Sequence, residues 1–414
     1  MTSVGVVGLG KLGMPTAITI SRLGHQVRGY DIYPQRMTLD ALPPYELDAD
    51  KAGPLSDQIT GDLSLQFCPL EEVVNESDCL FVAVETPHGR LYEGVTRLPA
   101  TRADFSYDTL TSAIRAIMEV ARKPVEIGVI STVLPGTIRK LVLPLIGDST
   151  LVYCPQFVAM GTVAYDLRHP EFTLLGYADH KPTTVKAVLE ELRAEPAETF
   201  ELSYESAELA KVTYNTFIGA KVTISNVVQQ TAQMTGASAS EVFGVLRSAH
   251  RRLASPSYLG PGMGDGGPCH PRDNIALSWL ARELNMGADL FSALMLQRQD
   301  YVGWLADQFL AAAGDRPLVL LGTAYKPGTP LETGSSSVLM ANLLAESGQQ
   351  VTLIRTAADL TALDLGARPY AFFVGCPDRE LFALPFPAGS IVVDPWHVVE
   401  PSDGVEVWHV GEPR

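Results

Sequence analysis

A glycine-rich segment near the beginning of the chain constrains its fold more than any other feature. Gly8, Gly10 and Gly13 form a G-x-G-x-x-G pattern. This pattern follows a β-rich run at Ser3–Val7 and precedes a helix-like run at Met14–Leu23. Glycines let the backbone approach a phosphate closely, and a helix N-terminus attracts its negative charge. The sequence therefore predicts a strand, turn and helix that bind the pyrophosphate of a dinucleotide, rather than a glycine turn without a ligand.

Asp31 directly follows a second strand-like run, Gln26–Tyr30. A carboxylate at this position can accept hydrogen bonds from both ribose hydroxyls of an adenosine, and it would repel a 2′-phosphate. These properties favour NAD over NADP as the cofactor. Arg36 follows closely and keeps NADP open, because a guanidinium can bind that phosphate.

Strand-like and helix-like runs alternate through the first part of the chain, which predicts a parallel sheet covered on both faces. Further strands are predicted at Cys79–Val84, Val125–Ile130 and Leu151–Cys154. A helix is predicted at Tyr107–Ala121. Residues 1–200 are therefore expected to form an NAD-binding Rossmann domain.

The rest of the chain divides into two regions. Apolar residues at helical spacing predict helices at Ser206–Met234 and Asn274–Asn285, so residues 201–312 are expected to be a central helical region. Strands and a helix return at Pro317–Leu321, Ser336–Ser347, Gln350–Ile354, Ala371–Val374 and Ser390–Val393. Residues 313–414 are expected to be a Rossmann-like α/β domain. The predicted fold class is thus α/β, with a Rossmann domain at each end and long helices between.

Composition narrows the location and the partners of the protein. A net charge of −16 over 414 residues argues against binding to nucleic acid or to anionic membranes. No apolar run is long enough to span a membrane, and no signal-peptide pattern precedes the first strand, so we expect a cytoplasmic protein. The cysteines are far apart and include no C-x-x-C pair, so we expect neither a disulfide framework nor a metal site.

Cys269 differs from the other cysteines in its setting. It lies in a loop at 255–273 that is rich in glycine and proline, and long irregular loops of this kind are often functional. Arg272 and the backbone amides of a helix expected to begin near Asn274 can stabilise a thiolate there. The remaining cysteines are expected to be small buried apolar side chains: Cys68, Cys79, Cys154 and Cys376.

Five motifs occur in order along the chain. They are G-x-G-x-x-G at Gly8–Gly13, S-T-x-x-P-G-T at Ser131–Thr137, E-x-A-K-x-x-x-N at Glu208–Asn215, G-G-x-C-x-P-K-D at Gly266–Asp273 and A-Y-K-P-G-T at Ala324–Thr329. In the fourth motif, Arg272 stands where lysine is usual. In this order and at comparable spacing they resemble the UDP-glucose and GDP-mannose dehydrogenase family over nearly the whole chain. The resemblance implies oxidation of the primary alcohol of a nucleotide sugar to the carboxylate, with two NAD per turnover and a thiohemiacetal and thioester on cysteine. It also implies a homodimer through the central helix and a C-terminal domain that binds the substrate's nucleotide.

The resemblance assigns catalytic roles to five residues. Cys269 is the expected nucleophile, and Lys211 and Asn215 are expected to donate to a developing oxyanion from one helix face. Asp273 is expected to hold a water or assist proton transfer, and Thr132 to approach the nicotinamide. Taken singly, Lys211 can also be a solvated helix charge, and Asn215 and Asp273 can be helix caps or loop ties.

The same resemblance extends to the binding residues. Expected at the cofactor are Gly8, Gly10, Lys11, Leu12, Gly13, Asp31, Arg36, Thr86 and Thr132. Expected at the substrate are Phe157, Lys211, Asn215, Arg252, Tyr258, Gly266 and Lys326.

The chain departs from the family pattern at positions that affect proton transfer. Gln156 and Met160 stand where the family usually has two glutamates that support proton transfer and thioester hydrolysis. Neither side chain can act as a general base, which leaves Asp273 and Glu85 as acidic candidates. His270 stands where an aromatic residue is often found.

Three functions stay open from the sequence. Oxidation to the acid predicts two NADH per substrate, and oxidation that stops at the aldehyde predicts one. The third is an NAD-binding protein without catalysis, which would have no need of Cys269. The substrate can be a nucleotide sugar or a related nucleotide alcohol, because the departures weaken any assignment to UDP-glucose.

Overall fold

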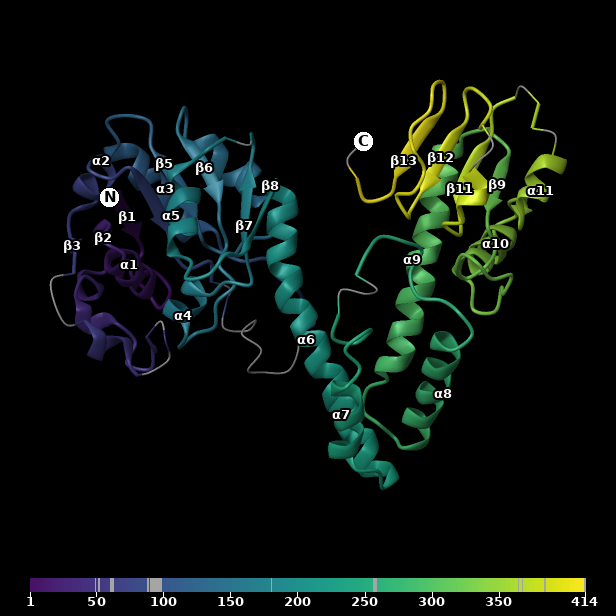
Figure 1. The fold of residues 1–414 in the computed structure, drawn as a ribbon, viewed down its shortest axis with the longest axis horizontal. Coiled ribbons are helices and arrows are strands. Elements are labelled where there is room, and N and C mark those ends of the chain that lie inside the picture. Colours follow the sequence, from purple (N-terminus) through teal and green to yellow (C-terminus); the bar gives the residue numbers. More distant parts are fainter. Residues whose placement is uncertain are drawn as a thin grey trace. The chain divides into compact units, whose positions relative to one another are not determined.

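The computed structural model describes residues 1–48, 50, 53–59, 63–87, 89, 99–179, 181–255, 259–363, 365–366, 368–382 and 385–412. The chain divides into two compact units, Met1–Ala220 and Lys221–Arg414. Each contains a twisted sheet with helices packed against it (Figure 1). The two units are described separately below.

The first unit is built on a sheet with the strand order β3-β2-β1-β4-β5-β6-β7-β8 in the described residues. Its strands are β1 (Ser3–Val7), β2 (Gln26–Tyr30), β3 (Leu65–Phe67), β4 (Cys79–Val82), β5 (Glu126–Val129), β6 (Thr150–Tyr153), β7 (Phe172–Tyr177) and β8 (Glu198–Ser203). Neighbouring strands are parallel, except that β6 and β7 are antiparallel, with Tyr153 opposite Gly176. The strand order reverses at β1 and β4, which creates a crevice at their carboxyl ends.

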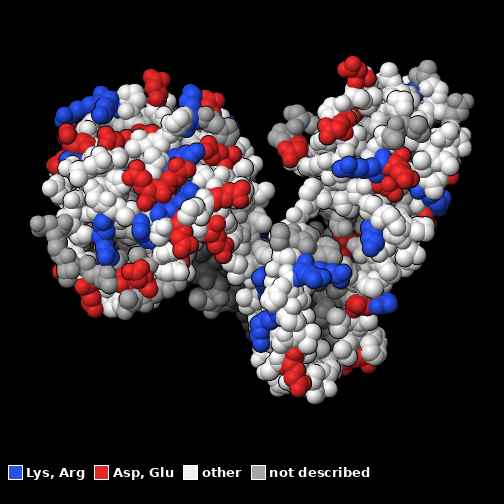
Figure 2. Space-filling model, in the orientation of Figure 1, with Lys and Arg blue, Asp and Glu red and all other residues white. Residues whose placement is uncertain are grey.

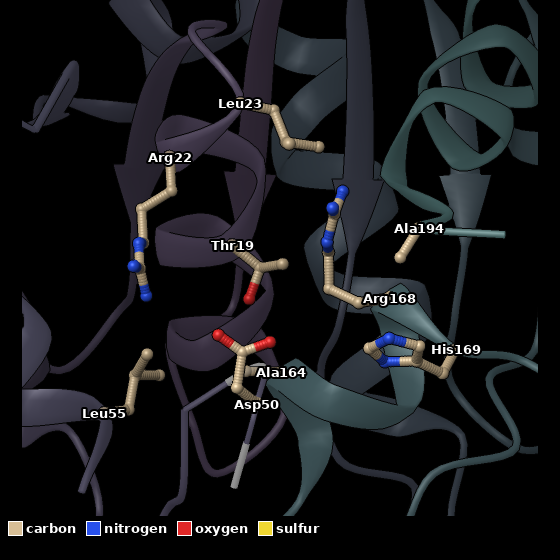
Figure 3. Close-up of a pocket in the computed structure, with 9 residues that line it drawn as sticks. All are labelled: Thr19, Arg22, Leu23, Asp50, Leu55, Ala164, Arg168, His169 and Ala194. Atoms are coloured by element: carbon tan, nitrogen blue, oxygen red, sulfur yellow. The ribbon is translucent and has the colours of Figure 1, made fainter. Parts of the chain in front are cut away.

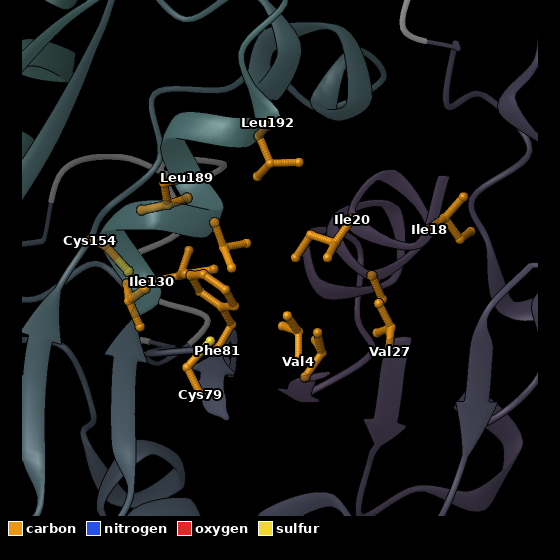
Figure 4. Packing of buried hydrophobic residues seen from close by; sticks show 14 of the residues in the cluster. Val4, Ile18, Ile20, Val27, Cys79, Phe81, Ile130, Cys154, Leu189 and Leu192 are labelled. Carbon is orange, nitrogen blue, oxygen red and sulfur yellow. The ribbon is translucent and has the colours of Figure 1, made fainter. Parts of the chain in front are cut away.

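Helices cover both faces of this sheet, as the sequence predicted. They are α1 (Gly13–Arg22), α2 (Leu70–Asn75), α3 (Asp108–Val120), α4 (Val163–Arg168) and α5 (Thr184–Leu192), with the short helical turns η1 (Pro34–Arg36), η2 (Leu39–Ala41), η3 (Leu55–Gln58), η5 (Ile138–Val142) and η6 (Leu143–Leu145). Residues from α1, α4 and α5 pack with Val4 and Phe81 in one buried cluster (Figure 4). On the other face, α3 buries Leu110, Ile114 and Ile117 in a second cluster, at the spacing of one helix face.

Long helices follow β8. The helix α6 (Tyr204–Thr235) begins in the first unit and continues into the second, and α7 (Ala239–Arg247), α8 (His270–Glu283) and α9 (Leu290–Ala313) come after it. The predicted start of α8 near Asn274 is wrong, because the helix begins four residues earlier at His270. Pro271 fits the first turn, where its missing N–H would have no partner within the helix. Cys269 is consequently the N-cap residue of α8.

The second unit carries a parallel sheet with the order β10-β9-β11-β12-β13 in the described residues. Its strands are β9 (Leu318–Leu321), β10 (Val351–Ile354), β11 (Ala371–Val374), β12 (Ile391–Asp394) and β13 (Glu406–His409), with α10 (Ser336–Glu346), α11 (Ala357–Ala362) and η7 (Arg379–Phe382) between them. Helices α9 and α10 cover one face, where Phe309 and Met340 are buried. Leu360 of α11 and Leu381 of η7 pack on the other face.

The surface agrees with the acidic composition. On the face shown in Figure 2, acidic and basic side chains are interspersed rather than gathered into one broad basic area. Within the described ranges, no helix combines the length and the apolarity that crossing a membrane requires.

Candidate active site

The glycine turn between β1 and α1 has geometry that larger residues cannot adopt. Gly8 has a φ of +94°, a left-handed conformation that side chains with a Cβ rarely adopt. A Cβ atom on Gly13 would lie 1.8 Å from the carbonyl oxygen of Gly8. A Cβ atom on Gly10 would lie 3.8 Å from its nearest neighbour, the Arg36 guanidinium. The protein thus leaves open space beside Gly10, where a ligand can approach the backbone.

Asp31 connects this turn to the end of β2. It is 4% exposed, and its Oδ2 accepts a hydrogen bond from the Leu9 N–H at 2.8 Å. Its Oδ1 accepts one from the Tyr33 N–H at 2.9 Å. Arg36 Nη1 lies 3.6 Å from Asp31 Oδ2, and the guanidinium stacks over the Tyr33 ring at 5.0 Å. These contacts hold a carboxylate beside the glycine turn, where an adenosine ribose would lie.

A pocket of about 510 Å³ opens at the carboxyl ends of β1, β2 and β4. It is lined by Val7, Gly8, Gly10, Tyr30, Asp31, Ile32, Tyr33, Arg36, Leu70, Ala83, Val84, Glu85, Asp108, Thr109, Ser112, Ala113 and Ala116. One side presents backbone and a carboxylate, and the other presents α3, whose lining residues include the apolar Ala113 and Ala116. This combination fits the adenosine half of a dinucleotide, which needs a polar ribose site and an apolar wall for the base.

Thr86 and Thr132 meet at the same edge of the sheet. The Thr86 hydroxyl donates a hydrogen bond to the Thr132 carbonyl at 2.7 Å, and the Ser131 hydroxyl donates to the Val84 carbonyl at 2.6 Å. The loops after β4 and β5 are therefore fastened together. Lys11 is exposed and Leu12 half-buried, both in the turn that precedes α1.

Glu208 is a site residue to which sequence reasoning gave no role. It is fully buried, and its carboxylate accepts hydrogen bonds from the N–H groups of Gly136 at 2.5 Å and Ile138 at 2.7 Å. Burial raises the pKa of this carboxyl group, against the lowering effect of the two backbone donors. Glu208 thereby connects α6 to the loop that follows β5. Its position in the E-x-A-K motif, three residues before Lys211, could have indicated that it belongs to the site.

Lys211 is a buried cation on α6. It is 7% exposed, its Nζ donates to the Gln156 carbonyl at 2.8 Å, and it lies 4.6 Å from the centre of the Phe157 ring. Burial lowers the pKa of Lys211. Phe157 packs edge-on against Tyr214 at 4.8 Å between ring centres. Asn215 lies one turn beyond Lys211 and is exposed. The hydrogen bond from Lys211 to Gln156 connects α6 to the loop after β6.

Cys269 is the exposed cysteine of the described residues, and the other four are buried as expected. Burial raises the pKa of Cys68 to about 11 and of Cys376 to about 11, and raises those of Cys79 and Cys154 as well. These four thiols are therefore poor nucleophiles at neutral pH. Cys269 instead stands at the N-terminus of α8, where the helix dipole favours negative charge.

The loop before Cys269 is held by hydrogen bonds to α9 and to the residues at the start of α10. Arg298 of α9 donates from Nε to the Asp265 carbonyl at 2.6 Å and from Nη2 to the Gly334 carbonyl at 3.0 Å. The Ser336 hydroxyl donates to the same Asp265 carbonyl at 2.9 Å, and the Gly267 N–H donates to Gly334 at 3.0 Å. Burial lowers the pKa of Arg298.

The remaining predicted residues of the second unit lie on its surface or outside the description. Asp273 forms an ion pair with Arg272 at 2.9 Å. Arg252 is exposed after α7, and Lys326 is exposed with its amine 5.5 Å from the Tyr325 ring centre. Gly266 is half-buried in the cysteine loop. Tyr258 lies outside the described residues.

The structure therefore brings the predicted residues together in two sets. The first unit holds the cofactor residues with Phe157, Lys211 and Asn215, and the second holds Cys269 and Asp273 with the other predicted substrate residues of its surface. That the two sets meet around one substrate stays a prediction.

A second pocket of the first unit contains none of the predicted residues. Its volume is about 260 Å³, and it lies between α1 and α4 (Figure 3). It is lined by Thr19, Arg22, Leu23, Asp50, Leu55, Ala164, Arg168, His169 and Ala194. Arg168 has a structural role here, since its Nη1 donates to the Leu192 carbonyl at 2.7 Å.

Family comparisons agree with this geometry. The model described as the NAD-binding domain of the UDP-glucose/GDP-mannose dehydrogenase family matches residues 2–195, and the model of that family's central domain matches residues 205–297. The chain belongs to this dehydrogenase family. The predicted resemblance is confirmed, and the cofactor is NAD, which the glycine turn and Asp31 fit. The hypothesis of a non-catalytic NAD-binding protein is not retained, because the family is one of oxidoreductases.

Individual relatives support the same placement. The dehydrogenase is 28% identical over 365 residues to the GDP-mannose 6-dehydrogenase of Pseudomonas aeruginosa, covering 84% of this chain and 80% of that protein. It is 26% identical over 357 residues to a UDP-glucose 6-dehydrogenase of Bacillus subtilis, covering 83% and 77%. Its fold is similar to that in the crystal structure of a ternary complex of GDP-mannose dehydrogenase from Pseudomonas aeruginosa, with a TM-score of 0.82 and 24% identity over 98% of this chain and 99% of that one. The predicted α/β fold class is confirmed.

Proposed function

We propose that this dehydrogenase oxidises the primary alcohol of a nucleotide sugar to the carboxylate, with two NAD per turnover and with Cys269 as the covalent nucleophile. The observation that carries the proposal is the exposed thiol at the N-terminus of α8, in a chain whose other described cysteines are buried. Relatives named GDP-mannose and UDP-glucose 6-dehydrogenases support nucleotide sugars as the substrate class.

The first unit would hold the cofactor. The turn at Gly8–Gly13 and the N-terminus of α1 would bind its pyrophosphate, and Asp31 its adenosine ribose. Thr86 and Thr132 would lie nearer to the nicotinamide, because their loops follow the central strands. NAD supplies the acceptor for the two hydrides that leave the substrate carbon.

Cys269 would act between the two oxidations. Its thiolate adds to the aldehyde carbon to form a thiohemiacetal, and loss of the second hydride converts this to a thioester. Water then replaces the sulfur, releasing the acid and the free thiol. Lys211 and Asn215 would donate hydrogen bonds to the oxygen that becomes negative in these steps, and Asp273 would hold a water or help to move a proton.

The nucleotide of the substrate would bind at the second sheet. Its strand order reverses at β9 and β11, and ligands of open α/β sheets bind at the carboxyl ends beside such a reversal. Gly322 and Gly375 follow these two strands, and a Cβ atom on Gly375 would lie 2.5 Å from the Gly322 carbonyl oxygen. Lys326 follows β9 on the same side and is the candidate cation for a diphosphate.

The test is a panel of nucleotide sugars, including GDP-mannose and UDP-glucose, assayed for NADH and for acid product. We expect two NADH per molecule of one sugar nucleotide and its conversion to the acid. Cys269→Ala is expected to abolish acid formation. Acid formed by Cys269→Ala at the wild-type rate would exclude the covalent route.

A second candidate function is oxidation that stops at the aldehyde. It is favoured by Gln156 and Met160, which leave the loop after β6 without a carboxylate between Pro155 and Gly161. One NADH per substrate together with a trapped aldehyde would support it against the first proposal. The two functions differ only after the first hydride transfer, so a single stoichiometry measurement separates them.

We also propose a cytoplasmic homodimer that forms through the central helices of the second unit. Large apolar side chains are exposed there, including Ile224 of α6 at 46% and Trp279 of α8 at 63%. Exposed apolar residues along neighbouring helices are typical of protein interfaces. Ile224→Glu and Trp279→Glu are expected to convert a dimer to monomers in light scattering, whereas an unchanged dimer in both variants would place the interface elsewhere.

A further inference from the structure

We propose that His270, oriented by Asp265, is the general base that hydrolyses the acyl thioester on Cys269. This proposal rests on the proposed function for the identity of the acyl group. The base and the nucleophile are neighbours in sequence at the first turn of α8, and both belong to the second unit.

The hydrogen bond between the two side chains selects the form of histidine that can accept a proton. His270 Nδ1 lies 2.6 Å from Asp265 Oδ1. A carboxylate only accepts, so Nδ1 is the donor, and in the neutral ring Nε2 then carries the lone pair. In the described part of the chain no group is hydrogen-bonded to Nε2 of His270. The ring is therefore held with its basic nitrogen open to water.

The position of Asp265 is fixed by the rest of the unit. Its carbonyl accepts hydrogen bonds from Arg298 at 2.6 Å and from Ser336 at 2.9 Å. Its Oδ1 also accepts from the Gly266 N–H at 2.9 Å. A base that is itself oriented by an anchored carboxylate is the arrangement that assists nucleophilic catalysis in unrelated enzymes.

Other residues that were considered as the base are less suited to this step. Asp273 forms an ion pair with Arg272 at 2.9 Å, so its Oδ1 already has a partner. Gln156 and Met160 cannot take a proton. The side chains of His270 and Asp265 are 57% and 43% exposed, so both are accessible to water.

The step balances without an oxidant or a reductant. A water oxygen adds to the thioester carbon while Nε2 of His270 takes a water proton. The carbon–sulfur bond then breaks, the Cys269 thiolate leaves with the bonding pair, and the acid is released. The imidazolium returns its proton to the thiolate or to solvent, which restores the starting state.

The test uses the full chain and p-nitrophenyl acetate, an activated ester that acylates thiols without NAD or a nucleotide sugar. In the wild type, we expect a burst of nitrophenolate followed by steady turnover as acetyl-Cys269 is hydrolysed. In His270→Phe and Asp265→Asn, we expect the burst to remain. Steady turnover should fall by about 10²- to 10⁴-fold for His270→Phe, the usual contribution of a positioned general base. Steady turnover should fall less for Asp265→Asn, because the His270 ring remains but its tautomer is no longer fixed.

Mass spectrometry provides a readout that a purely structural role would not change. Acetyl-Cys269 should accumulate in His270→Phe, and added imidazole should release it. His250→Phe, an exposed histidine of the same unit, is the matched control and should behave as wild type. Deacylation of His270→Phe at the wild-type rate, with no trapped acetyl group, would overturn the proposal.

The experiments distinguish failure of the proposed dehydrogenase function from failure of the proposed base. If no nucleotide sugar is oxidised but ester deacylation depends on His270, the role of His270 as a base is supported and the nucleotide-sugar substrate is excluded. If a sugar nucleotide is oxidised to acid by His270→Phe as fast as by the wild type, the base falls and the dehydrogenase function stands. If Cys269→Ala still shows the burst, the nucleophile itself is misassigned and both proposals fall.

Discussion

At the scale of single residues, Gly13 leaves the least room for change in the cofactor site. A methyl group there would lie 1.8 Å from the Gly8 carbonyl oxygen, so either the turn or the start of α1 must move. Gly13→Ala is therefore expected to raise the Kd for NAD at least tenfold, which corresponds to about 1.4 kcal/mol. Titration of NAD by calorimetry measures the change.

Gly303→Ala is the matched control for that substitution. Gly303 lies within α9 with no atom within 4 Å of an added Cβ, and alanine stabilises a helix interior by about 1 kcal/mol over glycine. This variant should bind NAD normally and melt at a higher temperature. Equal NAD affinity in Gly13→Ala and the wild type would contradict the role given to the turn.

The sequence could predict residues whose role depends on local geometry. Gly8, Gly13 and Asp31 belong to one strand–turn–helix–strand unit, β1-α1-β2, so their spacing alone brings them together. The contacts of Lys211 with Gln156, and of His270 with Asp265, depend on side-chain directions that spacing does not specify. Glu208 was missed for a further reason. Its partners are backbone N–H groups, which almost every residue type carries, so the sequence does not identify them.

At the scale of elements, Glu208 fastens the loop after β5 to α6. Glu208→Ala would leave the half-buried N–H of Gly136 and the buried N–H of Ile138 without their acceptor, at a cost of about 3 kcal/mol in the free energy of unfolding. Glu208→Gln retains an acceptor oxygen and should cost less. Chemical denaturation of the three proteins checks the order.

Glu208 also predicts a pH dependence. Its pKa is raised in the folded protein, so the folded state binds more protons than the unfolded state above the ordinary carboxyl pKa of about 4.3. The contribution of this group to stability is therefore full below that pKa and is lost as the pH rises through the raised value. As the pH rises through that range, the unfolding free energy of the wild type should fall relative to that of Glu208→Gln. If the two free energies change with pH in parallel, the raised pKa does not belong to Glu208.

Sequence reasoning located some of the strands to the residue. β1, β2 and β11 have the bounds that their apolar runs predicted. β8 was missed because its residues Glu198–Ser203 alternate between exposed and half-buried at the edge of the sheet. The start of α8 was misplaced because Pro271 was interpreted as part of a loop, although proline is compatible with a first helical turn.

At the scale of the whole molecule, each of the four hydrophobic clusters draws its described members from one unit. We therefore expect calorimetry to detect two unfolding transitions. NAD at a concentration of 100 Kd should stabilise the first unit by about 2.7 kcal/mol and so raise the temperature of its transition. GDP or UDP should raise the temperature of the transition of the second unit. A single transition whose temperature rises equally with NAD and with the nucleotide would contradict this division.

The separate sheets also affect how such an enzyme can diversify. Each sheet has its own reversal of strand order and its own buried clusters, so the parts expected to recognise cofactor and sugar nucleotide are built on different sheets. Under the proposed function, mutations around β9 and β11 would alter which sugar nucleotide is accepted without changing the residues that bind NAD. Exchange of the C-terminal segment between relatives is accordingly a short evolutionary path to new specificity.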